Sequence, residues 1–168
     1  MTESKAARFI GISGILEKQS KVQEAEKFLK QAVVTDPKNI QLHLALFGFY
    51  IRQKNVESAE TEITKTIEDN PKDLDLRILL GNFYLGQRKE DKAEAAYLKA
   101  IEIAPDNAKS YMNAGGFYET VNKNDKALEL YQKALTIQKD DPRIMDPIAR
   151  VYFKQKNIAE SENISMLF

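Results

Sequence analysis

The residues that could carry out chemistry on their own are few in this chain. It contains a single histidine, His43, and no cysteine. A zinc site or a histidine-based catalytic triad needs several such groups, so either would have to take residues from another chain. We expect His43 to be a buried or half-buried histidine whose ring nitrogens are satisfied.

The acidic residues and the glycines form no catalytic pattern either. Glu17 with Glu24, and Asp140 with Asp141, fall on expected turns or helix surfaces, so we interpret them as solvated charges. The glycine pair that starts at Gly115 lies inside an expected helix, and no Gly-Lys-Ser/Thr sequence follows any glycine. The sequence therefore predicts a protein that is not an enzyme and that needs no metal or cofactor.

Composition limits the classes of partner. The chain has 168 residues, of which 43% are apolar, and this favours one domain over residues 1–168. Its 25 basic residues balance 25 acidic ones, so no net charge favours nucleic acid. The apolar segment 9–16 is too short to span a bilayer and lacks a cleavage site. We expect a soluble cytoplasmic protein with no nucleic-acid partner and no membrane insertion.

The elements that must position the side chains come from an internal repeat of 34 residues, which is visible as columns of one residue type. The aromatic column consists of Tyr50, Tyr84, Tyr118 and Tyr152. The first alanine column consists of Ala25, Ala59, Ala93 and Ala127. The proline column consists of Pro37, Pro71 and Pro105. Several independent columns at one period indicate a repeat architecture.

The repeats cover residues 6–39, 40–73, 74–107, 108–141 and, cut short, 142–168. Each contains two apolar-periodic segments of about 14 residues joined by a polar turn, which is typical of a helix–turn–helix unit. Asn55, Asn124 and Asn157 are expected to cap the start of a second helix. The prolines follow the end of that helix.

The pattern resembles the tetratricopeptide repeat (TPR), whose motif has a small residue at place 8 of the repeat, Tyr at 11, Ala at 20, an aromatic at 24, Ala at 27 and Pro at 32. The third repeat matches all six places with Gly81, Tyr84, Ala93, Tyr97, Ala100 and Pro105. The resemblance implies an all-α, right-handed superhelical solenoid of antiparallel helix pairs. It also implies a protein–protein interaction scaffold.

Three departures from the motif predict local differences. Phe47 occupies the small place 8 of the second repeat, so either its helices separate or Gly48 takes over the close contact. Lys139 replaces the proline of the fourth repeat, so its second helix is expected to run further. Pro147 predicts either a kink or a helix that starts late, with Asp146 as its N-cap.

The resemblance further implies that places 2, 5, 9, 12 and 13 of each first helix face a concave groove. The candidate peptide-binding residues are Gln41, Leu44, Gly48, Ile51, Asp75, Ile78, Asn82, Leu85, Lys109, Met112, Asn113, Gly116 and Arg143. An apolar trough edged by charge suits an extended peptide or an amphipathic helix. For Leu44, Ile78 and Met112 a second interpretation stays open, in which they only pack between neighbouring first helices.

Some TPR proteins clamp the C-terminal carboxylate of a partner with cations and asparagines at fixed places. Here Asn82, Asn113 and Arg143 fit that set, but Ile78 and Pro147 stand where two cations are needed. Because charge-assisted bonds supply much of such a site, the sequence does not favour binding of a charged C-terminal tail. The two asparagines could instead bond the backbone of a bound segment.

The sequence leaves alternatives to a peptide-binding scaffold of unknown protein partner. The fifth repeat stops part-way through its second helix, so its apolar face needs a cover. Further residues of a longer protein, a second copy, or the curled-back tail could supply one. The alternatives are thus a self-associating structural module, or the targeting or assembly portion of a larger enzyme or export complex.

Overall fold

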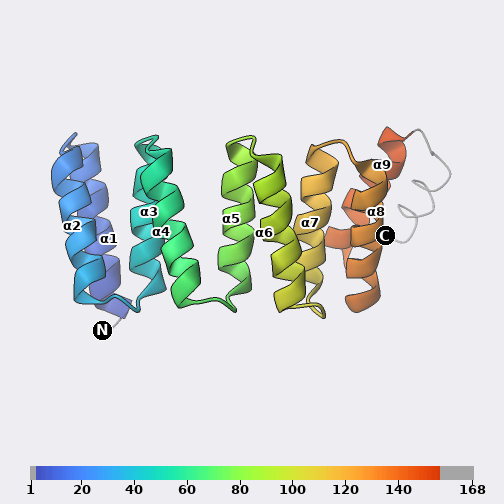
Figure 1. The fold of residues 1–168 in the computed structure, drawn as a ribbon, viewed down its shortest axis with the longest axis horizontal. Coiled ribbons are helices and arrows are strands. Elements are labelled where there is room, and N and C mark those ends of the chain that lie inside the picture. Colours follow the sequence, from blue (N-terminus) through green and yellow to red (C-terminus); the bar gives the residue numbers. More distant parts are fainter. Residues whose placement is uncertain (1–2, 156–168) are drawn as a thin grey trace. The chain divides into compact units, whose positions relative to one another are not determined.

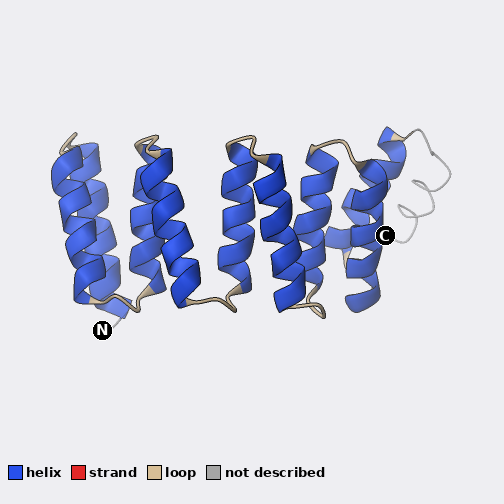
Figure 2. Ribbon diagram, in the orientation of Figure 1, coloured by secondary structure: helices blue, strands red, loops and turns tan. Residues whose placement is uncertain are grey.

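The computed structural model describes residues 3–155, and side chains from Lys5 onward. Within this range every regular element is a helix, and the connections are short loops (Figure 2). The elements are α1 Glu3–Lys18, α2 Val22–Thr35, α3 Ile40–Arg52, α4 Val56–Asp69, α5 Leu74–Gly86, α6 Glu90–Ile103, α7 Ala108–Thr120, α8 Asn124–Ile137 and α9 Pro142–Lys154. The all-α class is confirmed.

The chain forms two compact units, residues 1–71 and 72–168. In the first unit α1 packs on α2 and α3 on α4, and α3 also contacts both helices of the preceding pair (Figure 1). In the second unit α5 pairs with α6 and α7 with α8, while α7 contacts α5 and α6, and α9 contacts α7 and α8. The single domain over residues 1–168 stays a prediction.

The four hairpin turns that the structure describes share one backbone conformation. Ser20, Lys54, Arg88 and Asn122 follow their first helices with φ between 57 and 61°. In the second repeat, Lys54 N–H donates to Ile51 O at 3.0 Å and Asn55 N–H donates to Tyr50 O at 2.9 Å. These two bonds define a Schellman motif, which satisfies the last carbonyls of the helix and reverses the chain.

Small residues allow the helices of a pair to approach closely in the second unit. A Cβ atom added to Gly81 would lie 2.7 Å from the Tyr97 ring, and one added to Gly115 would lie 2.6 Å from the Tyr131 ring. In the first unit, the prediction that Gly48 takes over the close contact is wrong. A Cβ atom added to Gly48 would meet only Arg52, at 3.2 Å. Phe47 itself is buried there, at the place that glycine occupies in α5 and α7.

The helix caps confirm one sequence expectation and correct another. The Asn55 side chain accepts from Ser58 N–H at 3.1 Å, as an N-cap should. Asn124 is not a cap; Lys123 precedes α8, and Asn124 is the first helical residue. It stands one place later in its repeat than Asn55, so its carbonyl oxygen cannot reach the same N–H groups. Asn157 lies outside the described residues.

The fourth and fifth repeats contain two further corrections. Helix α8 ends at Ile137 and has 14 residues, the same length as α2, α4 and α6, so Lys139 does not extend it. Helix α9 does not start late, because Asp141 caps it by accepting from Arg143 N–H at 2.9 Å. Pro147 therefore lies inside the helix, where it removes one backbone hydrogen bond.

Candidate functional site

The structure places the candidate groove residues on α3 in the first unit and on α5, α7 and α9 in the second. Gln41 and Ile51 are exposed on α3, and Leu44 and Gly48 are partly buried. On α5 and α7 the partly buried members are Leu85, Met112, Asn113 and Gly116. The exposed members are Asp75, Asn82, Lys109 and Arg143. Ile78 is only 6% exposed, which agrees with the interpretation that it packs between helices.

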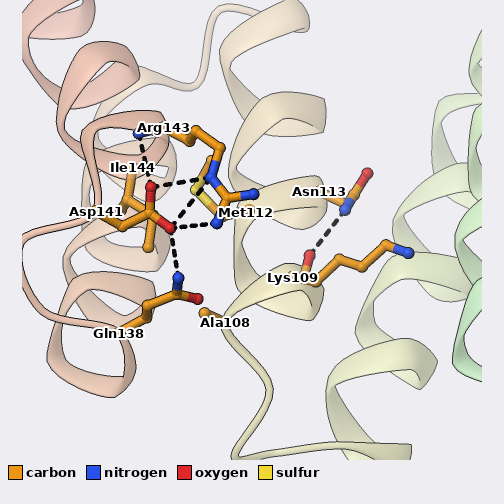
Figure 3. A pocket seen from close by; sticks show the side chains of 8 residues that line it. All are labelled: Ala108, Lys109, Met112, Asn113, Gln138, Asp141, Arg143 and Ile144. Carbon is orange, nitrogen blue, oxygen red and sulfur yellow. Dashed lines mark hydrogen bonds and ion pairs between the residues drawn. The ribbon is translucent and has the colours of Figure 1, made fainter.

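Four of these residues share one pocket in the second unit. It has a volume of ≈ 330 Å³ and lies between the start of α7, the end of α8 and the start of α9 (Figure 3). Its lining consists of Ala108, Lys109, Met112, Asn113, Gln138, Asp141, Arg143 and Ile144. The pocket therefore combines an apolar wall with amide and charged groups.

An ion pair forms the α9 side of the pocket. Arg143 Nη2 donates to Asp141 Oδ2 at 2.6 Å, and its Nε donates to Oδ1 at 3.0 Å. Gln138 Nε2 donates to the same Oδ2 at 2.5 Å. The Arg143 guanidinium holds the pKa of Asp141 below its usual value, while the Arg143 side chain remains 80% exposed. Asp141 is thus a structural cap, which corrects its interpretation as a solvated charge.

The α7 side of the pocket carries Lys109 and Asn113. Lys109 Nζ lies 2.6 Å from Asp75 Oδ1 on α5, and its side chain extends away from the Arg143–Asp141 pair (Figure 3). Both members of that ion pair are more than half exposed, so it contributes little stability and exchanges easily. Asn113 Nδ2 donates to Lys109 O at 2.8 Å, which leaves its Oδ1 as an acceptor.

The side-chain amide of Asn82 on α5 is held by its oxygen, whereas that of Asn113 is held by its nitrogen. Asn82 Oδ1 accepts from the Tyr97 hydroxyl at 2.6 Å, so the Nδ2 group is the part of the amide that can donate to a ligand. Burial raises the pKa of Tyr97 to about 12, so this hydroxyl remains a donor at neutral pH. Asn82 and Asn113 therefore present a donor and an acceptor respectively.

A charged cluster at the α7–α9 contact was not predicted from the sequence. Glu119 is 9% exposed and accepts from Arg150 Nε and Nη2, both at 2.9 Å, from Lys154 Nζ at 2.6 Å and from the Tyr131 hydroxyl at 3.0 Å. Hydrogen bonds from Arg150, and secondarily from Lys154 and Tyr131, lower the pKa of Glu119 to about 2. The signal available was an acid at place 12, followed one repeat later by bases at places 9 and 13.

His43 and Glu17 are both held by partners within the fold. His43 is 4% exposed, with Nδ1 2.5 Å from Glu62 Oε1 and Nε2 3.0 Å from Pro37 O. This is the satisfied histidine that the sequence predicted. Glu17 is not a solvated charge, because it receives two hydrogen bonds from Arg52, at 2.8 and 3.0 Å.

Residues 3–155 contain neither a metal-binding cluster nor a membrane-spanning helix. Within them no cluster of three or more His, Cys, Asp or Glu side chains could hold a metal ion. In the same range no helix combines the length and the apolar character needed to cross a membrane.

Two family models, both described as tetratricopeptide repeat, match residues 16–73 and 73–140. No curated protein matches the chain by sequence. Among solved structures, PilF of Pseudomonas aeruginosa is 18% identical with a TM-score of 0.70, covering 99% of this chain and 76% of that one. MamA of Desulfovibrio magneticus RS-1 is 16% identical with a TM-score of 0.68, covering 99% and 93%. A thermophilic TPR protein of Thermus thermophilus is 17% identical with a TM-score of 0.65, covering 95% and 87%. At these identities the structures support the fold alone.

Proposed function

Because the chain belongs to the tetratricopeptide repeat family, whose members generally act as protein-interaction scaffolds, we propose that it is a non-catalytic scaffold that binds a segment of a partner protein. The binding face consists of the first helices α5, α7 and α9 of the second unit. The face of α3 that carries Gln41, Leu44, Gly48 and Ile51 is a further binding surface of the first unit. The pocket between α7 and α9 is the observation that carries this proposal.

The pocket favours a segment with an apolar side chain next to an acidic one. Ala108 and Ile144 are 6% and 2% exposed, so they form a fixed apolar wall, and Met112 adds an adaptable one. A volume of ≈ 330 Å³ can accommodate a side chain such as leucine, methionine or phenylalanine. An apolar anchor would thus enter between α7 and α9.

Two cations at the rim favour the acidic group. Arg143 uses its Nε and Nη2 edge for Asp141, so its Nη1 edge is the one that a partner carboxylate can reach. Lys109 can exchange its exposed partner Asp75 for such a carboxylate at small cost. The acidic residue of the bound segment would lie at the solvent side of the anchor.

The two amides favour recognition of backbone. Asn82 offers Nδ2 to a peptide carbonyl, and Asn113 offers Oδ1 to a peptide N–H, because Tyr97 and the Lys109 carbonyl occupy their other atoms. Such bonds add affinity without selecting a side chain. The selectivity of the site would therefore reside in the anchor and its acidic neighbour.

The test is selection of peptides from a displayed random library on the full chain, followed by affinity measurement by calorimetry. We expect the selected peptides to share an acidic residue beside an apolar one. Met112→Asp and Arg143→Ala should each weaken their binding at least tenfold without lowering the melting temperature. Lys139→Ala, which removes an exposed cation near the pocket but outside its lining, is the matched control. Equal binding by wild type and both pocket variants would disprove the site.

A further inference from the structure

The N-caps of α3, α5, α7 and α9 all stand at place 34 of the preceding repeat. They are Asn39, Asp73, Asn107 and Asp141. Each accepts a hydrogen bond from the backbone N–H two residues later, at 2.9–3.2 Å. Asparagine and aspartate thus make the same cap in this chain, in agreement with their similar preference for N-cap positions. Capping α9 therefore does not require the negative charge of Asp141.

Asp141 differs from the other three caps in the residue that follows it at place 2 of the helix. The residues at place 2 are Gln41, Asp75, Lys109 and Arg143, so only Asp141 is an acid followed by a cation. Arg143 folds back onto its own cap, with Nη2 2.6 Å from Asp141 Oδ2 and Nε 3.0 Å from Oδ1. Lys109 follows the neutral Asn107 and instead reaches Asp75 on α5, at 2.6 Å. The charge of the cap thus accounts for the position of Arg143.

Asp141 does not depend on the guanidinium for its hydrogen bonds. Its Oδ1 accepts from the Arg143 backbone N–H at 2.9 Å, and its Oδ2 accepts from Gln138 Nε2 at 2.5 Å. Asp141 is only 8% exposed, so these bonds are needed to satisfy its two oxygens. Because both bonds remain when the Arg143 side chain turns away, the guanidinium can move to another carboxylate without leaving a buried oxygen unpaired.

We propose that Asp141 competes with the carboxylate of the bound segment for Arg143, and thereby sets how strongly the pocket prefers an acidic segment. This inference rests on the proposed function of the pocket. In the unbound chain Asp141 occupies the Nε–Nη2 edge of Arg143, so a segment reaches only the Nη1 edge (Figure 3). The occupied edge is one whose two N–H groups can bond a single carboxylate together. Asp141 therefore keeps the binding of acidic segments weaker than Arg143 alone would make it.

The test compares the wild type with Asp141→Asn and Asp141→Ser, using the full chain and calorimetry. Both replacements keep a side-chain oxygen that can cap α9, as Asn39 and Asn107 cap their helices, and neither carries a charge. The probes are the acidic peptide selected on the wild type and the same peptide with its carboxylate side chain changed to the amide. Both variants should bind the acidic peptide about fivefold tighter than the wild type does, and the amide peptide within about twofold of it.

Asp73→Asn is the matched control. It removes a charge from the same place one repeat pair earlier, where the cap is followed by Asp75 and holds no cation. This variant should bind both peptides as the wild type does. Unchanged or weaker binding of the acidic peptide by both Asp141 variants would overturn the proposal. An equal gain for the amide peptide, or an equal gain in Asp73→Asn, would also overturn it, because the release of Arg143 would then not be the cause.

The Nε–H signal of Arg143 in nuclear magnetic resonance reports the restraint without any peptide. Its order parameter should be high in the wild type and should fall in Asp141→Asn, because the carboxylate holds the guanidinium. An Arg143 side chain that is equally mobile in both proteins would refute the role of Asp141. Failure of the proposed function is a separate result: unchanged peptide binding by Met112→Asp and Arg143→Ala would refute the pocket itself, whereas the Asp141 results refute only the competition.

Discussion

Two helix pairs, α3–α4 in the first unit and α5–α6 in the second, distribute side-chain volume in opposite ways at the same two places. In α5–α6 the first helix supplies Gly81 and the second supplies Tyr97, whose ring lies where a Cβ would be. In α3–α4 the first helix supplies Phe47 and the second supplies Ile63, and both are buried. The large residue changes helix while the crossing stays filled, which agrees with the tolerance of close-packed cores for exchanges that conserve volume.

The difference matters because tyrosine brings a hydroxyl that needs a partner. In the second unit that partner lies on a first helix: Asn82 accepts from Tyr97, and Glu119 accepts from Tyr131. Phe47 and Ile63 carry no such group. A glycine on the first helix opposite a tyrosine on the second (the small–large arrangement) therefore orients polar side chains on the proposed binding face. A phenylalanine on the first helix opposite an isoleucine on the second (the large–small arrangement) only fills space.

The largest expected effect comes from removing the large residue of the first unit. Phe47→Gly should lower the free energy of unfolding by about 4 kcal/mol or more, since it creates a cavity and adds a helical glycine. Adding Ile63→Tyr should recover part of the loss by restoring the small–large arrangement. Urea unfolding followed by circular dichroism measures both, and hydrogen exchange of α3 and α4 amides locates the change. A double variant no more stable than Phe47→Gly alone would refute interchangeability.

The second prediction concerns overpacking in the second unit. Gly115→Ala places a methyl group 2.6 Å from a Tyr131 ring that is itself 2% exposed, so it should cost about 1–3 kcal/mol. Gly86→Ala is the matched control, because nothing lies within 4 Å of its Cβ position. Without a clash, the gain in helix propensity should raise stability by up to about 1 kcal/mol. Equal melting temperatures for the two variants would argue against close packing at Gly115.

The smallest effect is a pH dependence in the second unit. The pKa of Glu119 falls from 4.5 to about 2 on folding, so its stabilisation is complete above pH 4.5 and is lost as pH falls through 2. Glu119→Gln should cost on the order of 1–2 kcal/mol at pH 7, and its difference from wild type should shrink below pH 4.5. Glu102→Gln, at a 64% exposed ion pair, should change stability little at any pH. A loss for Glu119→Gln that stays constant from pH 7 to 2 would contradict the assigned pKa.

Much of the fold was predictable because the repeat marks its own boundaries. The first residues predicted for repeats two to five are those at which α3, α5, α7 and α9 begin. Two predictions are wrong for local reasons. Asn124 has the side chain of an N-cap but lies one place too late in its repeat. Helix α9 does not start late at Pro147, because Asp141 caps it at Pro142. Local propensity was overridden in both cases by the neighbouring backbone geometry.

The candidate site was predictable in part. Lys109, Met112, Asn113 and Arg143 were expected on one face, and they do line one pocket. The sequence could not show that Arg143 is engaged by Asp141, because that depends on side-chain rotamers. Glu119 was missed for a related reason: its bases lie 31 and 35 residues away, and only the packing of α9 on α7 brings them to it.

The left-handed residue in each described hairpin turn explains how α3–α4 can differ from α5–α6 and α7–α8 in its core. Because the Schellman bonds after Tyr50 and Tyr118 are alike, the second helix starts at the same place in the repeat whichever helix carries the bulky side chain. The turn fixes where the second helix starts. The two residues at the helix crossing can therefore change through two compensating substitutions without shifting any other position of the repeat. Substitutions in the core of such a repeat can therefore change which polar side chains its surface presents. The length of the repeat and its packing on neighbouring repeats stay constant.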